Sequence, residues 1–335
     1  MSTPESLLES EHLPDPMGAA EETASSVAGR SPMQLAMARF REDRKSMAAL
    51  IVVLVYVVAG VLAPILVHFG VLDPFTYHTN LIDANGLAEG RFWGISWHHP
   101  LGVEPGIGRD SLSRLWYGIT FSLFIALTAS LLAMVIGVLL GIVAGMSGGW
   151  VDAVIGRLID LGLCFPQTIM LIALSTTMVA FLTGTLHIPA GNAAQATFVI
   201  GVLAIFGWMA PARLIRGQVL SLREREFVSA AHLLGASRRR IWIKEILPNL
   251  WAPVLVNFTL MLPAFVSTEA ALSYLGVSIK APTPTLGNIM GDAVKYANGG
   301  FLYFISPAIL IALIVVAFNL LGDGLRDALD PKASR

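Results

Sequence analysis

A polar stretch, Glu226-Phe-Val-Ser-Ala-Ala-His-Leu-Leu-Gly235, interrupts a chain that consists mainly of long apolar runs. Its stripe-forming residues fall at the helical spacing i, i+3, i+4 and i+7, at Phe227, Ala230, Ala231 and Leu234. This spacing predicts a short helix, from about 224 to 234, and Gly235 stands where such a helix would end in a left-handed cap. The stretch is either an ordinary basic connector, whose amphipathic helix can also lie on a membrane, or a helix that docks against another protein. The two alanines favour a protein, because small side chains permit close approach.

The apolar runs on either side decide the class of protein. Hydrophobic residues make up 55% of the 335 residues and charged residues 13%, which excludes an ordinary soluble domain. A bilayer core takes roughly 20 apolar residues per helix. The runs that meet this length are approximately Met47 to Phe69, Ile119 to Met146, Ile159 to Leu182, Ala196 to Ile215, Trp251 to Leu275 and Phe301 to Gly322. The sequence therefore predicts an all-α membrane protein with six transmembrane helices.

The distribution of Lys and Arg predicts the orientation, because cytoplasmic loops retain positive charge. With the N-terminus inside, the basic residues that fall outside are only Arg91, Arg109, Arg114, Lys280 and Lys295. Both termini are therefore predicted to be cytoplasmic. The chain divides into a disordered cytoplasmic tail (1–32), a basic segment with the first transmembrane helix (33–69), an extracytoplasmic segment (70–118), a helical core (119–325) containing a cytoplasmic loop (217–245), and a cytoplasmic tail (326–335).

The sequence lacks the motifs that nucleotide binding or catalysis would need. None of its lysines follows a glycine, so it contains no Gly-x-x-x-x-Gly-Lys-Ser/Thr loop. His98-His99 is an isolated pair, and Cys164 lies in an apolar run, where we expect a small buried side chain. We therefore predict no catalytic residue, metal or cofactor in this chain, with any ATP and Mg held by partner subunits.

The polar stretch carries a resemblance to a known family. Ser229-Ala230-Ala231-x-x-x-Gly235, with Ile246-Leu247-Pro248 downstream, resembles the EAA loop of permease subunits of binding-protein-dependent ABC importers. Ser229 stands where Glu is usual, and Glu245 where Ile is common. In that family the loop forms a coupling helix that sits in a cleft of the ATP-binding subunit. The resemblance implies that 217–245 is a coupling loop whose ATPase-coupling residues are Glu226, Phe227, Ser229, Ala230, Ala231, Leu234 and Gly235.

Further motifs resemble the peptide and nickel branch of this family. They are His99-Pro-Leu-Gly102 with Gly108-Arg-Asp110, Ala271-Leu-Ser-Tyr-Leu-Gly276 with the stretch 282–288, and the tail 322–331. The resemblance implies a C-type permease with the type I importer fold, multi-pass in the bacterial plasma (inner) membrane, that imports peptides and has 119–325 as its permease core. The implied partners are a homologous B-type permease, two ATP-binding subunits, an extracytoplasmic substrate-binding protein and membrane lipid, without nucleic acid.

Other cargoes and another mechanism stay open. Nickel, oligosaccharides and other small solutes use closely related permeases. An ion-driven secondary transporter would need ionisable groups at the membrane midplane, and Glu269 is the one borderline candidate. A carboxylate in an apolar run is costly unless it faces water or a partner, so we predict a pathway or gate role for Glu269 with Ser273. The alternative is that Glu269 lies near the outer end of its span, where Thr268 or Ser273 and solvent satisfy it.

Small residues, prolines and charges predict details of the bundle. Gly137, Gly141 and Gly145 recur every four residues, which favours close helix packing. Asp160 is expected to pair with Arg157 at helical spacing. Kinks are expected where proline removes a helix hydrogen bond, at Pro166, Pro211, Pro263 and Pro307.

Overall fold

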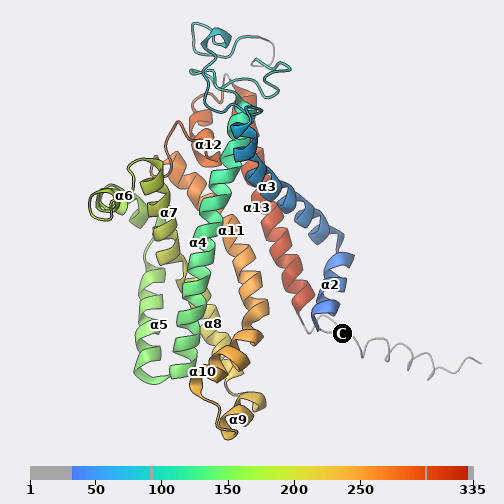
Figure 1. Cartoon of the computed structure of the whole chain (residues 1–335), viewed down its shortest axis with the longest axis vertical. Coiled ribbons are helices and arrows are strands. Elements are labelled where there is room, and N and C mark those ends of the chain that lie inside the picture. The colour runs from blue at the N-terminus through green and yellow to red at the C-terminus, as the bar shows by residue number, and fades with distance from the viewer. Residues whose placement is uncertain (1–31, 91–93, 299, 331–335) are drawn as a thin grey trace, which may run out of the picture.

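The structure is a computed structural model that describes residues 32–90, 94–298 and 300–330 (Figure 1). Within these ranges the chain forms helices and loops, and its only extended pairing consists of the isolated bridges Ile82–Ala88 and Val103–Asp110. The predicted all-α class is confirmed. The predicted disordered tail lies outside the described residues except for residue 32, as does the part of the predicted C-terminal tail after residue 330.

The helices follow one another along the chain with short connections, apart from the long segment that precedes α4. They are α2 Pro32–Glu42, α3 Arg44–His68, the 3-10 turn η1 Thr79–Leu81, α4 Ser111–Ser147, α5 Gly149–Cys164, α6 Gln167–Gly184, α7 Asn192–Gly207, α8 Met209–Leu222, α9 Glu226–Leu233, α10 Arg238–Arg240, α11 Trp251–Tyr274, α12 Leu286–Val294 and α13 Phe301–Leu329. By length and composition, 6 helical stretches of the described residues could cross a membrane. They are α3, α4, α6, α7 with α8, the stretch from α10 to α11, and α13, which confirms the predicted number of spans.

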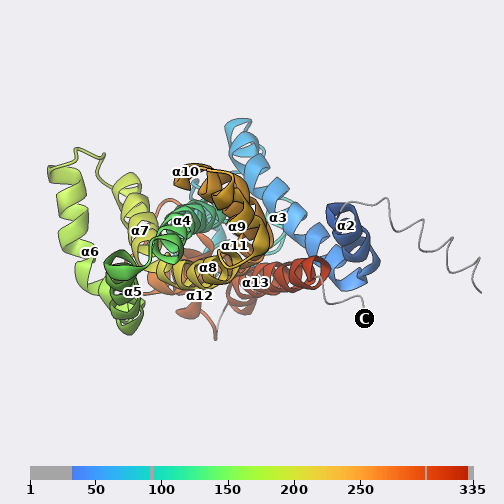
Figure 2. The same ribbon diagram turned by 90° about the horizontal axis from the view of Figure 1, so that it is seen from below.

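The third predicted span, over 159–182, has the wrong start. Pro166 has no N–H to donate and disfavours helical backbone in the residue before it. Phe165 accordingly adopts an extended conformation with φ −80° and ψ 130°, which ends α5. α6 then runs across the direction of α4 and extends from the side of the bundle (Figure 1 and Figure 2).

α4 is the central helix of the bundle. Its 37 residues span about 55 Å at ~1.5 Å per residue, well beyond the roughly 30 Å of a hydrocarbon core. α8 packs along it at the three buried glycines, where a Cβ atom would meet α8 closely. That atom would lie 2.8 Å from Pro211 Cβ at Gly137, 2.9 Å from Ile215 Cβ at Gly141 and 2.6 Å from Val219 Cγ1 at Gly145. Glycine at these positions lets the two backbones approach.

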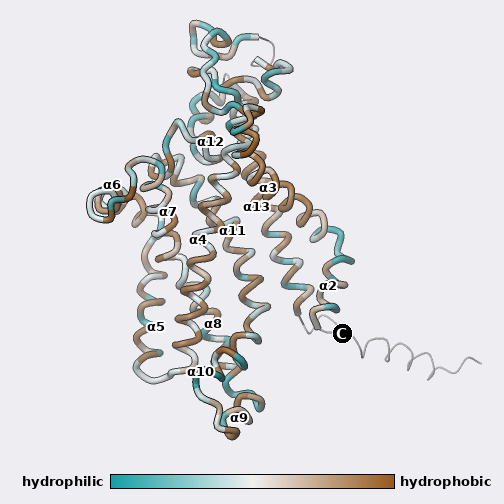
Figure 3. The backbone as a smooth tube through the Cα atoms, in the orientation of Figure 1, coloured by the Kyte–Doolittle hydropathy of each residue, from teal (hydrophilic) through white to brown (hydrophobic). Residues whose placement is uncertain are grey.

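The bundle has two polar ends, separated by apolar helices (Figure 3). We call the end that carries residues 70–110 the loop end, and the opposite end, around α2 and α9, the α9 end. At the loop end, a buried ion pair ties the long segment to the helices: Arg109 Nε donates to Glu104 Oε2 at 2.6 Å. Tyr303 of α13 also donates to Glu104, at 3.1 Å. The loop is therefore fixed to the bundle by buried polar contacts.

Candidate functional site

α9 exposes a small apolar face at the α9 end of the bundle, where it projects beyond the other helices (Figure 1). Leu233 and Leu234 are 89% and 88% exposed, and Phe227 is 38% exposed. Ala230 on the same helix is exposed as well. We call these four residues the docking face. Two leucines without any covering side chains form an apolar patch of the kind that marks an interaction site.

The opposite side of α9 holds the helix on the bundle. Val228 is 1% exposed and belongs to a buried cluster with Ile215 and Val219 of α8, and Ala231 packs against that cluster. Residues 228 and 231 are spaced i and i+3, so they share the inner side. The predicted stripe is therefore corrected: Ala231 lies toward the bundle, and Leu233 joins the exposed face.

The end of α9 has the capping geometry that the sequence predicts. Gly235 has a φ of +75°, in the left-handed region. Its N–H donates to the His232 carbonyl at 3.0 Å, and the Ala236 N–H donates to the Ala231 carbonyl at 3.0 Å. This is the Schellman pattern, which fixes the direction of the chain after a helix. Ser237 then caps the following turn, because its hydroxyl accepts a hydrogen bond from the Arg240 N–H at 3.4 Å.

The connection from this loop to α11 is not a regular α-helix. A π-helical turn over Ile241–Ile246 is followed by a 3-10 turn over Leu247–Leu250. Pro248 explains the change, because it lacks the N–H that an α-helix requires there. The Asn249 side chain donates to the Glu245 carbonyl at 2.6 Å and so satisfies one exposed acceptor. The sequence did not predict the π turn.

The carboxylate of Glu269 is fully buried near the loop end of α11. It accepts hydrogen bonds from Ser122 Oγ at 2.9 Å, Ser273 Oγ at 2.7 Å and Ser278 Oγ at 3.1 Å. Ser122 belongs to α4 and in turn accepts from the Leu286 N–H of α12 at 3.1 Å. Glu269 therefore ties α4, α11 and α12 together.

Of the local partners expected for Glu269, Ser273 is one and Thr268 is not. Thr268 Oγ1 donates instead to the Ala264 carbonyl at 2.8 Å. Solvent does not reach the carboxylate, whose residue is 0% exposed. Sequence spacing gave no sign of Ser122, which lies 147 positions away in the chain.

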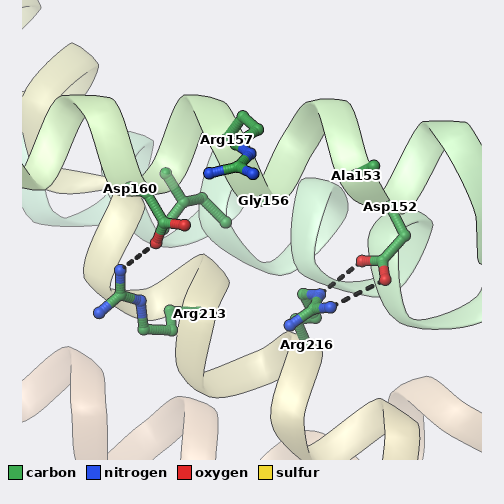
Figure 4. A pocket seen from close by; sticks show the side chains of 8 residues that line it. Asp152, Ala153, Gly156, Arg157, Asp160, Arg213 and Arg216 are labelled. Carbon is green, nitrogen blue, oxygen red and sulfur yellow. Dashed lines mark hydrogen bonds and ion pairs between the residues drawn. The ribbon is translucent and has the colours of Figure 1, made fainter.

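A second group of charges lies between α5 and α8 near the α9 end (Figure 4). Asp160 pairs with Arg213 at 2.5 Å, so the expected pairing with Arg157 is wrong. Arg213 belongs to α8 and reaches Asp160 because α8 packs against α5, and helical spacing within α5 does not reveal this contact. Asp152 accepts two hydrogen bonds from Arg216, at 2.5 and 2.8 Å, and this hydrogen bonding lowers the pKa of Asp152 below its usual range.

Two further features concern metal binding and the single cysteine. In the part of the chain that the structure describes, no group of three or more His, Cys, Asp or Glu residues could hold a metal ion. Cys164 is exposed at the end of α5, so the expected burial is wrong. The break at Pro166 places the end of α5 at the edge of the bundle.

Two parts of the chain match known protein families. Residues 137–335 match the family described as binding-protein-dependent transport system inner membrane component. Residues 31–88 match the N-terminal transmembrane domain of oligopeptide transport permease C.

Individual relatives agree with these family matches. The oligopeptide transport system permease protein OppC of Bacillus subtilis is 33% identical over 89% of this chain and 88% of its own length. OppC of Escherichia coli is 35% identical over 91% and 93%, respectively. The dipeptide transport system permease protein DppC of B. subtilis is 35% identical over 90% and 86%.

Among solved structures, a chain of the MetNI methionine ABC transporter in inward-facing conformations aligns with a TM-score of 0.50. The alignment covers 64% of this chain and 94% of that chain at 19% identity. This likeness bears on the fold alone, and it agrees with the predicted type I importer permease. The chain belongs to the family of binding-protein-dependent transport system inner membrane components, and is a membrane permease subunit of an ABC importer rather than an enzyme.

Proposed function

We propose that this chain forms half of the path by which an ATP-driven importer carries peptides across the bacterial plasma membrane. The observation that carries this proposal is the docking face of α9, which is exposed on one side and anchored by Val228 on the other. Peptide cargo is supported by the relatives, which are oligopeptide and dipeptide permeases.

The proposed partners are supported by the family match and by the two polar ends of the bundle. The docking face would sit in a cleft of an ATP-binding subunit, one of two that hold ATP and Mg. A homologous B-type permease would complete the path, and the loop end would receive an extracytoplasmic substrate-binding protein. In this orientation the α9 end and both termini lie in the cytoplasm. The basic residues of the 217–245 loop favour this orientation, because cytoplasmic loops retain positive charge.

The anchoring of α9 suggests how force passes into the bundle. Val228 contacts the cluster that holds Ile215 and Val219 of α8, and α8 packs closely on the glycines of α4. A displacement of α9 would therefore move α8 and α4 together. ATP binding must favour one of two arrangements of the permease pair to drive this change. The π and 3-10 turns before α11 interrupt the α-helical hydrogen bonding of the backbone. α11 can therefore change its position separately from α9, α8 and α4.

Glu269 and Ser273 retain a proposed role at the outer part of the path. The hydrogen bonds around the Glu269 carboxylate join α4, α11 and α12. A gate at this position would therefore open by movement of these three helices as one unit. The role is then one of holding the gate together rather than of contact with the solute.

The test is affinity purification of the tagged chain in mild detergent, followed by reconstitution of whatever copurifies into proteoliposomes. The proposal expects a second permease, P-loop subunits and ATP-dependent uptake of di- or oligopeptides when the binding protein is added. Uptake of nickel or oligosaccharide but not peptide would replace the cargo. A chain that purifies alone and takes up solute down a proton gradient would overturn the importer.

A further inference from the structure

The charged groove between α5 and α8 has unused hydrogen-bond donors. It encloses about 190 Å³ and is lined by three arginines and two aspartates. Asp152 and Asp160 each occupy one arginine, Arg216 and Arg213. Arg157 lies between these pairs (Figure 4) and makes no hydrogen bond or ion pair with any described residue. The groove therefore carries one net positive charge.

The three guanidinium groups offer more donors than the aspartates use. A guanidinium has about five N–H donors in a planar fork. Arg216 uses two nitrogens on Asp152, and Arg213 uses one on Asp160. The guanidinium of Arg157 and the remaining N–H groups of Arg213 and Arg216 all line the groove and stay available to an oxyanion that enters it. Phosphate suits this arrangement, because arginine forks bind its oxygens in pairs.

The position of the groove along α5 corresponds to the headgroup level of a bilayer. α5 begins at Gly149, just after the turn that ends α4, and Arg157 follows about 12 Å further along the axis at ~1.5 Å per residue. α4 exceeds the ~30 Å hydrocarbon core by about 25 Å, shared between its two ends. With that excess shared equally, the start of α5 lies about 12 Å beyond the hydrocarbon, and Arg157, about 12 Å along α5, lies at its edge.

An apolar stripe runs along α5 on the side that carries Arg157, with two residues before Arg157 and two after it. Trp150, Val154, Leu158 and Leu161 are 77%, 48%, 51% and 59% exposed. They are spaced at i, i+4, i+8 and i+11, so they share one side of the helix with Arg157 at i+7. A phosphate held at Arg157 would leave an attached acyl chain free to lie along Leu158 and Leu161, which follow Arg157 toward the hydrocarbon.

We propose that the α5–α8 groove binds the phosphate of an anionic phospholipid, with Arg157 as the principal ligand and Arg213 and Arg216 as supporting donors. Basic pockets between helices on the cytoplasmic side are suited to anionic headgroups, and each arginine near the surface contributes about 1 kcal/mol, or roughly fivefold in affinity. The site does not depend on which solute the permease carries.

The experiment measures lipid retention by the purified full-length chain, with the subunits that copurify, using native mass spectrometry. Phosphatidylglycerol and phosphatidylcholine are titrated separately, and inorganic phosphate is added as a competitor. Arg157→Gln should weaken phosphatidylglycerol retention about fivefold and leave phosphatidylcholine unchanged. Arg239→Gln serves as the matched control, because Arg239 is an exposed arginine of α10 outside the groove.

Three results would overturn the proposal. Equal retention of phosphatidylglycerol by wild type and Arg157→Gln would remove Arg157 as a ligand. Full displacement of the lipid by millimolar phosphate would assign the groove to a free anion. A photoreactive side chain at position 157 that labels a neighbouring protein subunit instead of lipid would make the groove a protein contact. Arg157→Gln is expected to fold, since Arg157 has no partner among the described residues, and its melting temperature checks this directly.

Discussion

Replacement of Gly235 by valine isolates the role of the cap after α9. The left-handed φ of +75° suits glycine, whereas a side chain there costs roughly 1–2 kcal/mol. A Cβ atom at Gly235 would meet no heavy atom within 4 Å, so the cost arises in the backbone and not from a clash. A cost of this size changes the population of the native cap by a factor of about 5–30. Because the cap sets the direction of Leu234 and of the chain that follows, docking should weaken by up to that factor.

The assay compares ATP hydrolysis with peptide uptake in proteoliposomes that contain the complete importer. Gly235→Val should lower the peptide transported per ATP hydrolysed, while Gly235→Asn should lie close to wild type, because asparagine tolerates the left-handed region. Gly217→Val is the matched control: Gly217 is a helical glycine of α8 with open space around its Cβ position. Wild-type coupling in folded Gly235→Val protein would show that the cap at Gly235 does not direct the docking of α9.

Three further predictions test other parts of the structure. Gly141→Val should destabilise the bundle by about 1–3 kcal/mol, measured as a lower melting temperature in detergent, because its Cβ would lie 2.9 Å from Ile215. Gly201→Val, whose Cβ would lie in open space, should not lower the melting temperature, and equal melting temperatures of the two variants would disprove close α4–α8 packing. Glu269→Leu leaves the buried hydroxyls of Ser122, Ser273 and Ser278 without their acceptor, which should cost about 1–3 kcal/mol of stability for each hydroxyl that stays unpaired. Glu269→Gln should retain most of the stability. Loss of uptake in Glu269→Gln at wild-type stability would indicate that Glu269 contacts the solute instead. The Arg216 hydrogen bond lowers the pKa of Asp152, so its stabilising effect is complete above the unfolded pKa of about 3.9 and is lost as pH falls through the lower folded pKa. The melting temperatures of wild type and Asp152→Asn should therefore differ by a constant amount from pH 8 to 5 and converge only below about pH 4. Convergence near pH 6 would contradict the pairing of Asp152 with Arg216.

Patterns that repeat along the chain were readable from the sequence. The apolar runs predicted the number of membrane helices because each helix must satisfy its own backbone in lipid. The stretch from Glu226 to Gly235 predicted a short helix and its cap because spacing and a terminal glycine are local signals.

Features that depend on distant segments were not readable in the same way. Two of the three partners of Glu269 come from α4 and from the segment after α11, and Asp160 meets Arg213 through the packing of two helices. The inner side of α9 was missed because Val228 stands next to Phe227, and an apolar pair can face either way until the bundle is known. The break at Pro166 was predicted only as a kink, and α6 turned out to run across the direction of α4 from that point.

The most direct test of the coupling helix is site-specific cross-linking from α9 to the ATP-binding subunit. Cys164 is first replaced by serine, because it is exposed and would react. Single cysteines are then introduced as Leu234→Cys on the docking face and Val228→Cys on the inner side, and each is labelled with a photoreactive maleimide. We expect an adduct with the ATP-binding subunit from position 234 and none from position 228. Labelling of lipid alone from position 234 would show that α9 lies on the membrane, and the central claim would be wrong.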